Sequence, residues 1–118
     1  MYEIGLSTPG FINEQLFANM AEAGIKHIEI SVDKGQSDAL DYGKLKEWSE
    51  KYGVHLWSFH LPFYPFSEID ISNPDLAEKS VEYFKGFIEK ASKIGIHKYI
   101  IHASGEPIEE KNRRARME

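Results

Sequence analysis

Chemically active side chains lie at or near the ends of four short β-rich runs of this sequence. They are Ser7 and Thr8, Glu29 and Ser31, His60, and His102. Neutral imidazole and carboxylate groups are suitable ligands for Zn²⁺, Mn²⁺ and similar divalent ions, and they are common acid–base groups. A single histidine at such a position could equally be a structural side chain held by a hydrogen bond, and Glu29 could be a structural acceptor. The equivalent positions of His60 and His102 favour their membership of one site.

The candidate residues belong to a repeated unit. In each copy the end of an amphipathic helix is followed by a glycine and then by a β-rich run. The copies are 21–31, 49–60 and 91–104. Their glycines follow the last helical turn, where a left-handed residue commonly ends a helix. These glycines are Gly24, Gly53 and Gly95. A further β-rich run, 3–8, precedes the first helix.

Strict alternation of strands and helices predicts parallel strands joined by right-handed crossovers. A doubly wound sheet would carry a glycine-rich phosphate loop after its first strand, and the residues 7–11 (STPGF) contain none. A closed barrel needs eight strands and about 250 residues. We therefore predict an α/β fold of four parallel strands, an incomplete TIM barrel, as one unit over residues 1–118. The longest helix is predicted to begin with Asn73 as its cap and Pro74 at its first position.

Pleat alternation predicts which strand residues face the barrel axis, where a βα barrel places its active site at the carboxyl ends of the strands. The inward set is Gly5, Ser7, His27, Glu29, Leu56, Ser58, His60, Ile100 and His102. The set predicted to pack against helices is Ile4, Leu6, Ile28, Ile30, Trp57, Phe59, Tyr99 and Ile101. His27, His55 and His97 lie at the amino ends of strands, so we predict structural or solvated roles for them.

The connection 61–73 is long for a βα loop and rich in aromatic residues. Phe63 and its neighbours could stack on a sugar, or they could pack against a missing half of the barrel. Asp70 and Ser72 are predicted to order this loop by local hydrogen bonds.

Composition narrows the possible functions. The 118 residues are 42% hydrophobic and 28% charged, which is typical of a globular domain. The absence of cysteine excludes disulfides and thiolate ligands. The net charge of −5 argues against a nucleic-acid partner, and the basic cluster of Lys111, Arg113, Arg114 and Arg116 is interpreted as a solvated helix face. Neither a membrane span nor a signal peptide is evident, so a cytoplasmic location is expected.

The run FHLPF (59–63) and the segment DISNPDLAEKSVEYFKGFIEKASKIGIHKYIIHAS (70–104) resemble the xylose-isomerase-like barrel superfamily. The runs IGLST (4–8) and AGIKHIEIS (23–31) are also similar to it. This superfamily joins sugar isomerases and epimerases to DNA-repair nucleases of the endonuclease IV type. The resemblance covers nearly the whole chain but only about half of a family member.

The resemblance implies that His60 and His102 lie at an active site. In the nuclease branch the equivalent histidines are zinc ligands, whereas in the sugar branch they line the substrate pocket. The sugar-branch metal is held chiefly by carboxylates and a histidine from strands five to eight. Glu29 matches a frequent acidic pocket position and is the catalytic candidate, and Ser7 and Phe63 are further substrate-binding candidates. The run IHAS (101–104) lacks the Pro-Gly that usually follows the histidine in the nuclease branch, and FHLPF lacks that branch's usual loop, so the sugar branch is favoured.

The expected function is therefore that of the amino-terminal part of a metal-dependent sugar or sugar phosphate isomerase or epimerase. Such an enzyme transfers a proton next to a carbonyl and would use Mn, Zn, Mg or Co. Whether this chain alone is an enzyme stays open, because most of the family's metal-binding carboxylates belong to later strands. One alternative is a zinc-dependent phosphodiesterase acting on abasic DNA. The other is a non-catalytic half-barrel that forms homo-oligomers through its exposed strand edges.

Overall fold

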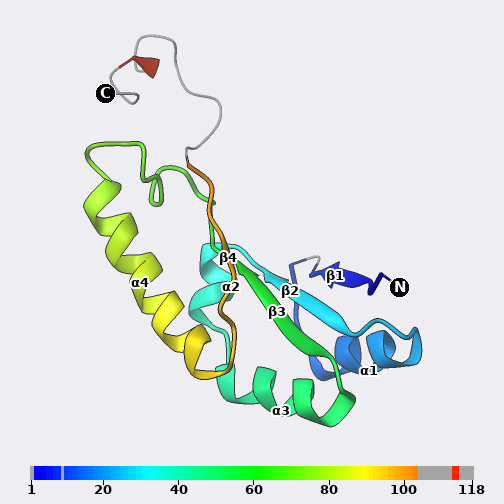
Figure 1. Ribbon diagram of the computed structural model, residues 1–118. Coiled ribbons are helices and arrows are strands. Elements are labelled where there is room, and N and C mark those ends of the chain that lie inside the picture. The colour runs from blue at the N-terminus through cyan, green and yellow to red at the C-terminus, as the bar shows by residue number, and fades with distance from the viewer. Residues whose placement is uncertain (1, 9, 104–112, 115–118) are drawn as a thin grey trace.

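The computed structural model describes residues 2–8, 10–103 and 113–114 (Figure 1). Four strands form one sheet in the order β1-β2-β3-β4, and every neighbouring pair is parallel. The strands are β1 (Gly5–Ser7), β2 (His27–Ser31), β3 (His55–His60) and β4 (Tyr99–Ile100). An α/β fold with four parallel strands in chain order is thus confirmed. The alternation of strands and helices also predicts a helix from Ile108 onward; Ile108 lies outside the described residues, as do Lys111 and Arg116 of the basic cluster.

The described helices are α1 (Glu14–Glu22), α2 (Lys34–Asp38), α3 (Tyr42–Tyr52) and α4 (Ala77–Lys93). Side chains cap the first three of them: Asn13, Asp33 and Asp41 each accept a hydrogen bond from a backbone N–H of the first turn. The short helix α2 is an addition to the predicted order of elements. Five residues are too few to show helical periodicity, and the local signal for α2 is the reciprocal capping box between Asp33 and Gln36.

The three repeat glycines adopt the predicted left-handed conformation. Their φ angles are 74° at Gly24, 64° at Gly53 and 93° at Gly95. Each lies at the end of a helix that runs into a strand, so the repeat correctly located the helix-to-strand junctions.

The predicted start of the longest helix was wrong. Helix α4 begins at Ala77 instead of Pro74. Asn73 caps a turn that comes before the helix: its side-chain oxygen accepts from the N–H of Asp75 at 3.1 Å, and its carbonyl accepts from the N–H of Ala77 at 2.8 Å. Asn73 and Pro74 therefore belong to the turn that precedes α4 and not to the helix itself.

One face of the sheet packs against the helices and forms the core. Ile28, Ile30 and Phe59 from the strands are fully buried there. They share one cluster with side chains from three helices, namely Phe17, Met20, Leu45, Phe84, Phe87 and Ala91. Full burial of a large apolar side chain contributes about 1.5–3 kcal/mol, so this layer holds the strands in register. The opposite side of the sheet, called the open face below, carries Glu29 and Ile100.

A register shift in β3 changes the predicted facing of two residues. Leu56 pairs with Ile28 and Ser58 pairs with Glu29, so Trp57 is an extra residue opposite β2. Leu56 is consequently buried among the helices, whereas Trp57 lies against His27 on the open face and is 46% exposed. The prediction that Leu56 faces the axis and Trp57 faces the helices was wrong because strict alternation does not allow for a bulge.

The predicted facing holds for other strand residues. The Tyr99 hydroxyl donates to the carbonyl of Ile96 at 2.5 Å and also lies 3.3 Å from the carbonyl oxygen of Ile88 in α4, which places Tyr99 on the helix side. The prediction was wrong for Ile4 and Ile101: they lie just outside β1 and β4 and are exposed instead of packing on helices. Within the described part of the chain, no helix is long and apolar enough to cross a membrane.

Candidate functional site

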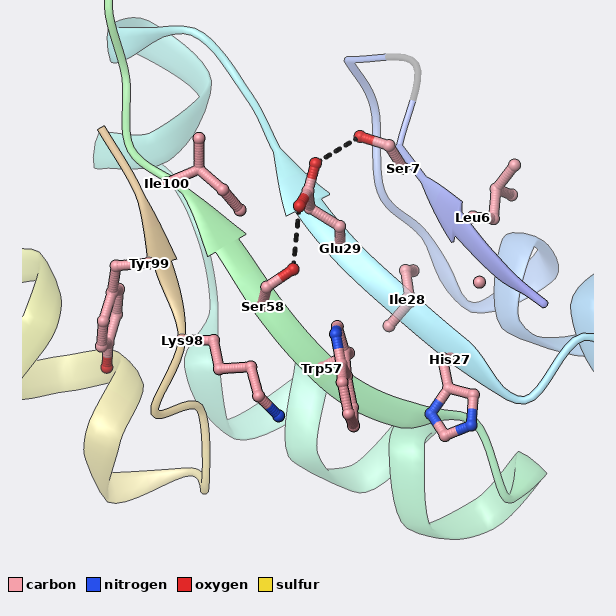
Figure 2. Close-up of a pocket in the computed structure, with 11 residues that line it drawn as sticks. Leu6, Ser7, His27, Ile28, Glu29, Trp57, Ser58, Lys98, Tyr99 and Ile100 are labelled. Carbon is pink, nitrogen blue, oxygen red and sulfur yellow. Dashed lines mark hydrogen bonds between the residues drawn. The ribbon is translucent and has the colours of Figure 1, made fainter. Parts of the chain in front are cut away.

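Glu29 is held between two serine hydroxyls on the open face. Ser7 donates to its Oε1 at 3.0 Å and Ser58 donates to its Oε2 at 2.8 Å (Figure 2). The three residues come from β1, β2 and β3 at matching positions of the parallel register. Both carboxylate oxygens are thus oriented by neutral donors, and each retains a free lone-pair direction for a ligand.

These residues line an open concavity of about 480 Å³. Its walls also include Trp57, Lys98 and Ile100 (Figure 2). The ammonium group of Lys98 lies 3.2 Å from the centre of the Trp57 ring, a cation–π contact. Pleat alternation indicated that Ser58 shares the face of His60 but did not identify it as a partner of Glu29. Trp57 and Lys98 were missed because a bulge and a loop place them here.

His60 and His102 meet at the carboxyl ends of adjacent strands. Their Nε2 atoms are 3.2 Å apart, and Nδ1 of His60 lies 3.2 Å from the carbonyl oxygen of Leu61. If Nδ1 of His60 carries its proton and donates to that carbonyl, then its Nε2 accepts from Nε2–H of His102. Two nitrogens bound to one tetrahedral Zn²⁺ at about 2.05 Å would be about 3.3 Å apart. The observed spacing therefore fits a shared metal ion.

The described residues supply no further ligand for such an ion beside the two histidines. Among residues 2–8, 10–103 and 113–114, no group of three or more His, Asp or Glu side chains could hold a metal. His60 and His102 therefore fit as two ligands of a metal ion whose other ligands are not among these residues.

Phe63 packs directly against the histidine pair. Its ring stacks on His102 with centroids 4.1 Å apart and planes 11° apart, and it meets His60 edge-on at 5.3 Å. The loop 61–73 therefore folds over the ends of β3 and β4. Asp70 and Ser72 order this loop as predicted, because Oδ1 of Asp70 accepts both the N–H and the hydroxyl of Ser72.

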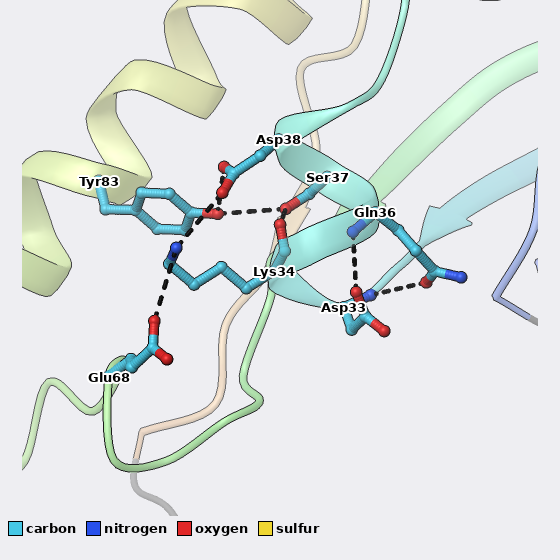
Figure 3. A network of polar contacts seen from close by, with 7 residues as sticks. All are labelled: Asp33, Lys34, Gln36, Ser37, Asp38, Glu68 and Tyr83. Carbon is cyan, nitrogen blue, oxygen red and sulfur yellow. Dashed lines mark hydrogen bonds and ion pairs between the residues drawn. The ribbon is translucent and has the colours of Figure 1, made fainter.

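Helix α2 anchors the same loop from the other side (Figure 3). The Lys34 ammonium lies 3.3 Å from Asp38 and 3.6 Å from Glu68 of the loop. The Tyr83 hydroxyl of α4 donates to Asp38 at 2.8 Å. Burial and the neighbouring Asp38 raise the pKa of Tyr83, so its hydroxyl stays protonated and donates. These contacts tie α2, α4 and the loop together.

The predicted residues form two groups on one side of the sheet. Ser7 and Glu29 form the first, and His60, His102 and Phe63 form the second. His60 pairs with Ser31, two residues beyond Glu29, which corresponds to roughly 7 Å along the strand. No direct contact links the two groups within the described residues, and a small bound molecule could span them.

The other three histidines lie away from this pair. His27 is 2.6 Å from Glu3 and packs edge-on against His55 and Trp57 at the amino end of the sheet. His55 and His97 are exposed. His27 also lines the concavity that contains Glu29, so the structural or solvated roles predicted for these three histidines stay predictions.

Comparison with known protein families finds no family that matches this chain, and comparison with curated proteins finds no match either.

Proposed function

We propose that this chain forms the first four βα units of a xylose-isomerase-like (β/α)₈ barrel. The sequential order β1-β2-β3-β4 supports this, because successive right-handed crossovers in one direction put every helix on the same face. A doubly wound sheet reverses its strand order and covers both faces with helices. Here the strand side chains that face the helices are buried, and those on the open face include the exposed Trp57 and Ile100.

We further propose that the site belongs to a metal-dependent sugar isomerase or epimerase. The observation that carries this proposal is the 3.2 Å approach of the two Nε2 atoms of His60 and His102, with Glu29 on the same side of the sheet. Histidine and carboxylate at the carboxyl ends of parallel strands are the groups that metal-assisted proton transfer requires.

In this mechanism, His60 and His102 bind substrate oxygens and Glu29 moves a proton at the carbon next to the carbonyl. Ser7 and Ser58 keep the carboxylate of Glu29 pointed into the open face. Phe63 shields the histidine pair from water on one side. A divalent ion (Mn, Zn, Mg or Co) would polarise the carbonyl and hydroxyl oxygens of the substrate. Its ligands would come chiefly from later strands of the complete barrel.

The test uses the complete protein encoded by the gene, in D₂O with Mn²⁺ and a panel of ketoses and ketose phosphates. We expect deuterium to enter at the carbon next to the carbonyl, measured by loss of the corresponding proton NMR signal. Glu29→Gln should slow this exchange by about 100-fold or more, a typical effect of losing a general base. Equal exchange in wild type and Glu29→Gln, or a gene without further βα units, would reject the proposal.

A zinc-dependent phosphodiesterase is the second candidate, because the spacing of the two Nε2 atoms also fits two ligands of one Zn²⁺ ion. In that case His60 and His102 are metal ligands. Incubating the complete protein with DNA that contains an abasic site, with Zn²⁺ present, separates the candidates. Strand cleavage that His60→Ala abolishes would favour the nuclease, and intact DNA would favour the sugar enzyme.

A further inference from the structure

A second hollow adjoins the histidine pair across the ring of Phe63. It measures about 290 Å³ and lies where β1 and β2 end. Its lining includes Thr8, Ser31, Asp33, Gln36, Phe63 and Tyr64. Phe63 lines this hollow and also stacks on His102, so a molecule that reaches both places contacts the same aromatic ring.

The polar groups of this hollow both donate and accept hydrogen bonds. Oδ1 of Asp33 and Oε1 of Gln36 are engaged in the capping box of α2. The Thr8 hydroxyl is engaged with the backbone of Ser31. Three polar atoms have no hydrogen-bond partner among the described residues: Oδ2 of Asp33, Nε2 of Gln36 and the hydroxyl of Ser31. Figure 3 shows the Gln36 amide projecting away from Tyr83, on the opposite side of α2 from the Lys34 contacts. Sugar hydroxyls, which donate and accept, match this set.

Aromatic surface lies beside these polar groups. Tyr64 is 60% exposed, and its backbone carbonyl accepts from the N–H of Lys34 at 3.4 Å, which fixes the loop against α2. An exposed ring next to convergent donors and acceptors suits a molecule with an apolar face and a polar rim.

The negative charge in the hollow disfavours the binding of a phosphate group. Asp33 contributes a carboxylate, and no lysine or arginine lines the hollow within the described chain. The nearest lysine in sequence, Lys34, directs its ammonium to Asp38 and Glu68. A phosphate group placed here would meet a like charge with no cation to offset it.

We propose that this hollow binds the neutral, hydroxylated part of the substrate, so that the site takes a free sugar in preference to a sugar phosphate. This proposal rests on the proposed sugar function and narrows its substrate class. Tyr64 and Phe63 contact the apolar face of the sugar, and Ser31, Asp33 and Gln36 bind its hydroxyls.

Titration of the isotope-labelled chain with D-fructose and, separately, with D-fructose 6-phosphate tests this inference by amide NMR shifts. We expect saturable shifts at Gln36 and Tyr64 with D-fructose in the range of about 1–50 mM, and at least about fivefold weaker binding of the phosphate. Tyr64→Ala should weaken D-fructose binding by about fivefold, whereas Tyr2→Ala, a fully exposed tyrosine outside the hollow, should not.

Asp33→Asn provides a second variant that preserves the fold, because asparagine also caps helices well. It should reduce the preference for the neutral sugar by removing the carboxylate. Tighter binding of the phosphate to wild type, unchanged D-fructose affinity in Tyr64→Ala, or no saturable shift with either compound would each overturn the inference. Failure of the isomerase chemistry would appear separately, as absent deuterium exchange in the complete protein while the sugar still binds in this hollow.

Discussion

At the scale of single residues, the site depends on how each polar side chain is oriented. Glu29 is fixed by two hydroxyl donors from neighbouring strands, at 3.0 and 2.8 Å. The imidazole nitrogens of His60 and His102 lie within hydrogen-bond distance of each other. The carbonyl of Leu61 constrains the His60 ring, and stacking on Phe63 constrains the His102 ring. Such preorganisation reduces the cost of ordering the groups when a ligand binds.

Zinc affinity tests the histidine pair directly. We expect the isolated chain to bind Zn²⁺ weakly through His60 and His102, and His60→Ala or His102→Ala to lower the affinity by about tenfold or more. His97→Ala is the matched control because His97 is exposed and lies at the other end of the sheet. Isothermal titration calorimetry supplies the measurement. Equal affinity in all four proteins would exclude the two histidines as ligands.

At the scale of elements, the register of β3 determines which of its side chains lie on the open face. The bulge at Trp57 keeps Leu56 and Phe59 in the helix layer while Ser58 stays beside Glu29. Helix α2 adds a second constraint because it ties the aromatic loop to α4 through Lys34, Asp38 and Tyr83.

Two alanine substitutions test which side chains of β3 face the helices. Phe59→Ala should lower the free energy of unfolding by about 3–5 kcal/mol, because the side chain is fully buried in the core. Trp57→Ala should cost about 1 kcal/mol or less, since the indole is half exposed on the open face. Urea denaturation measures both values. A larger loss for Trp57→Ala than for Phe59→Ala would contradict the bulged register.

At the scale of the whole molecule, the described helices cover one face of the sheet. The open face has a concavity of about 480 Å³, and the edge strands β1 and β4 are only three and two residues long. In a complete barrel the open face would become the filled interior and both edges would pair with further strands.

For the isolated 118-residue chain, we expect self-association through these edges and the open face. Light scattering should give a mass near twice 13.6 kDa. Ile100→Lys, which adds a charge to the edge strand β4, should shift the population toward monomer. Val81→Lys is the control, because Val81 is an exposed apolar residue on α4. A stable monomer of the unsubstituted chain would contradict this expectation.

The local pattern of the sequence was sufficient for the order of the four strands and of helices α1, α3 and α4, the left-handed glycines and the facing of β2. Helical period, pleat alternation and the steric freedom of Gly24, Gly53 and Gly95 act over a few neighbouring residues, so they can be predicted without tertiary contacts. The same reasoning brought Ser7 and Glu29 to one face and His60 and His102 to one end of the sheet.

Tertiary structure alone decided the details that control chemistry. The bulge at Trp57, the stacking of Phe63 on His102 and the 3.2 Å spacing of the Nε2 atoms join segments that are far apart in the chain. The hollow beside Tyr64 likewise depends on how the loop docks on α2. These features follow from interstrand register and side-chain packing, which alternation within a single strand does not encode.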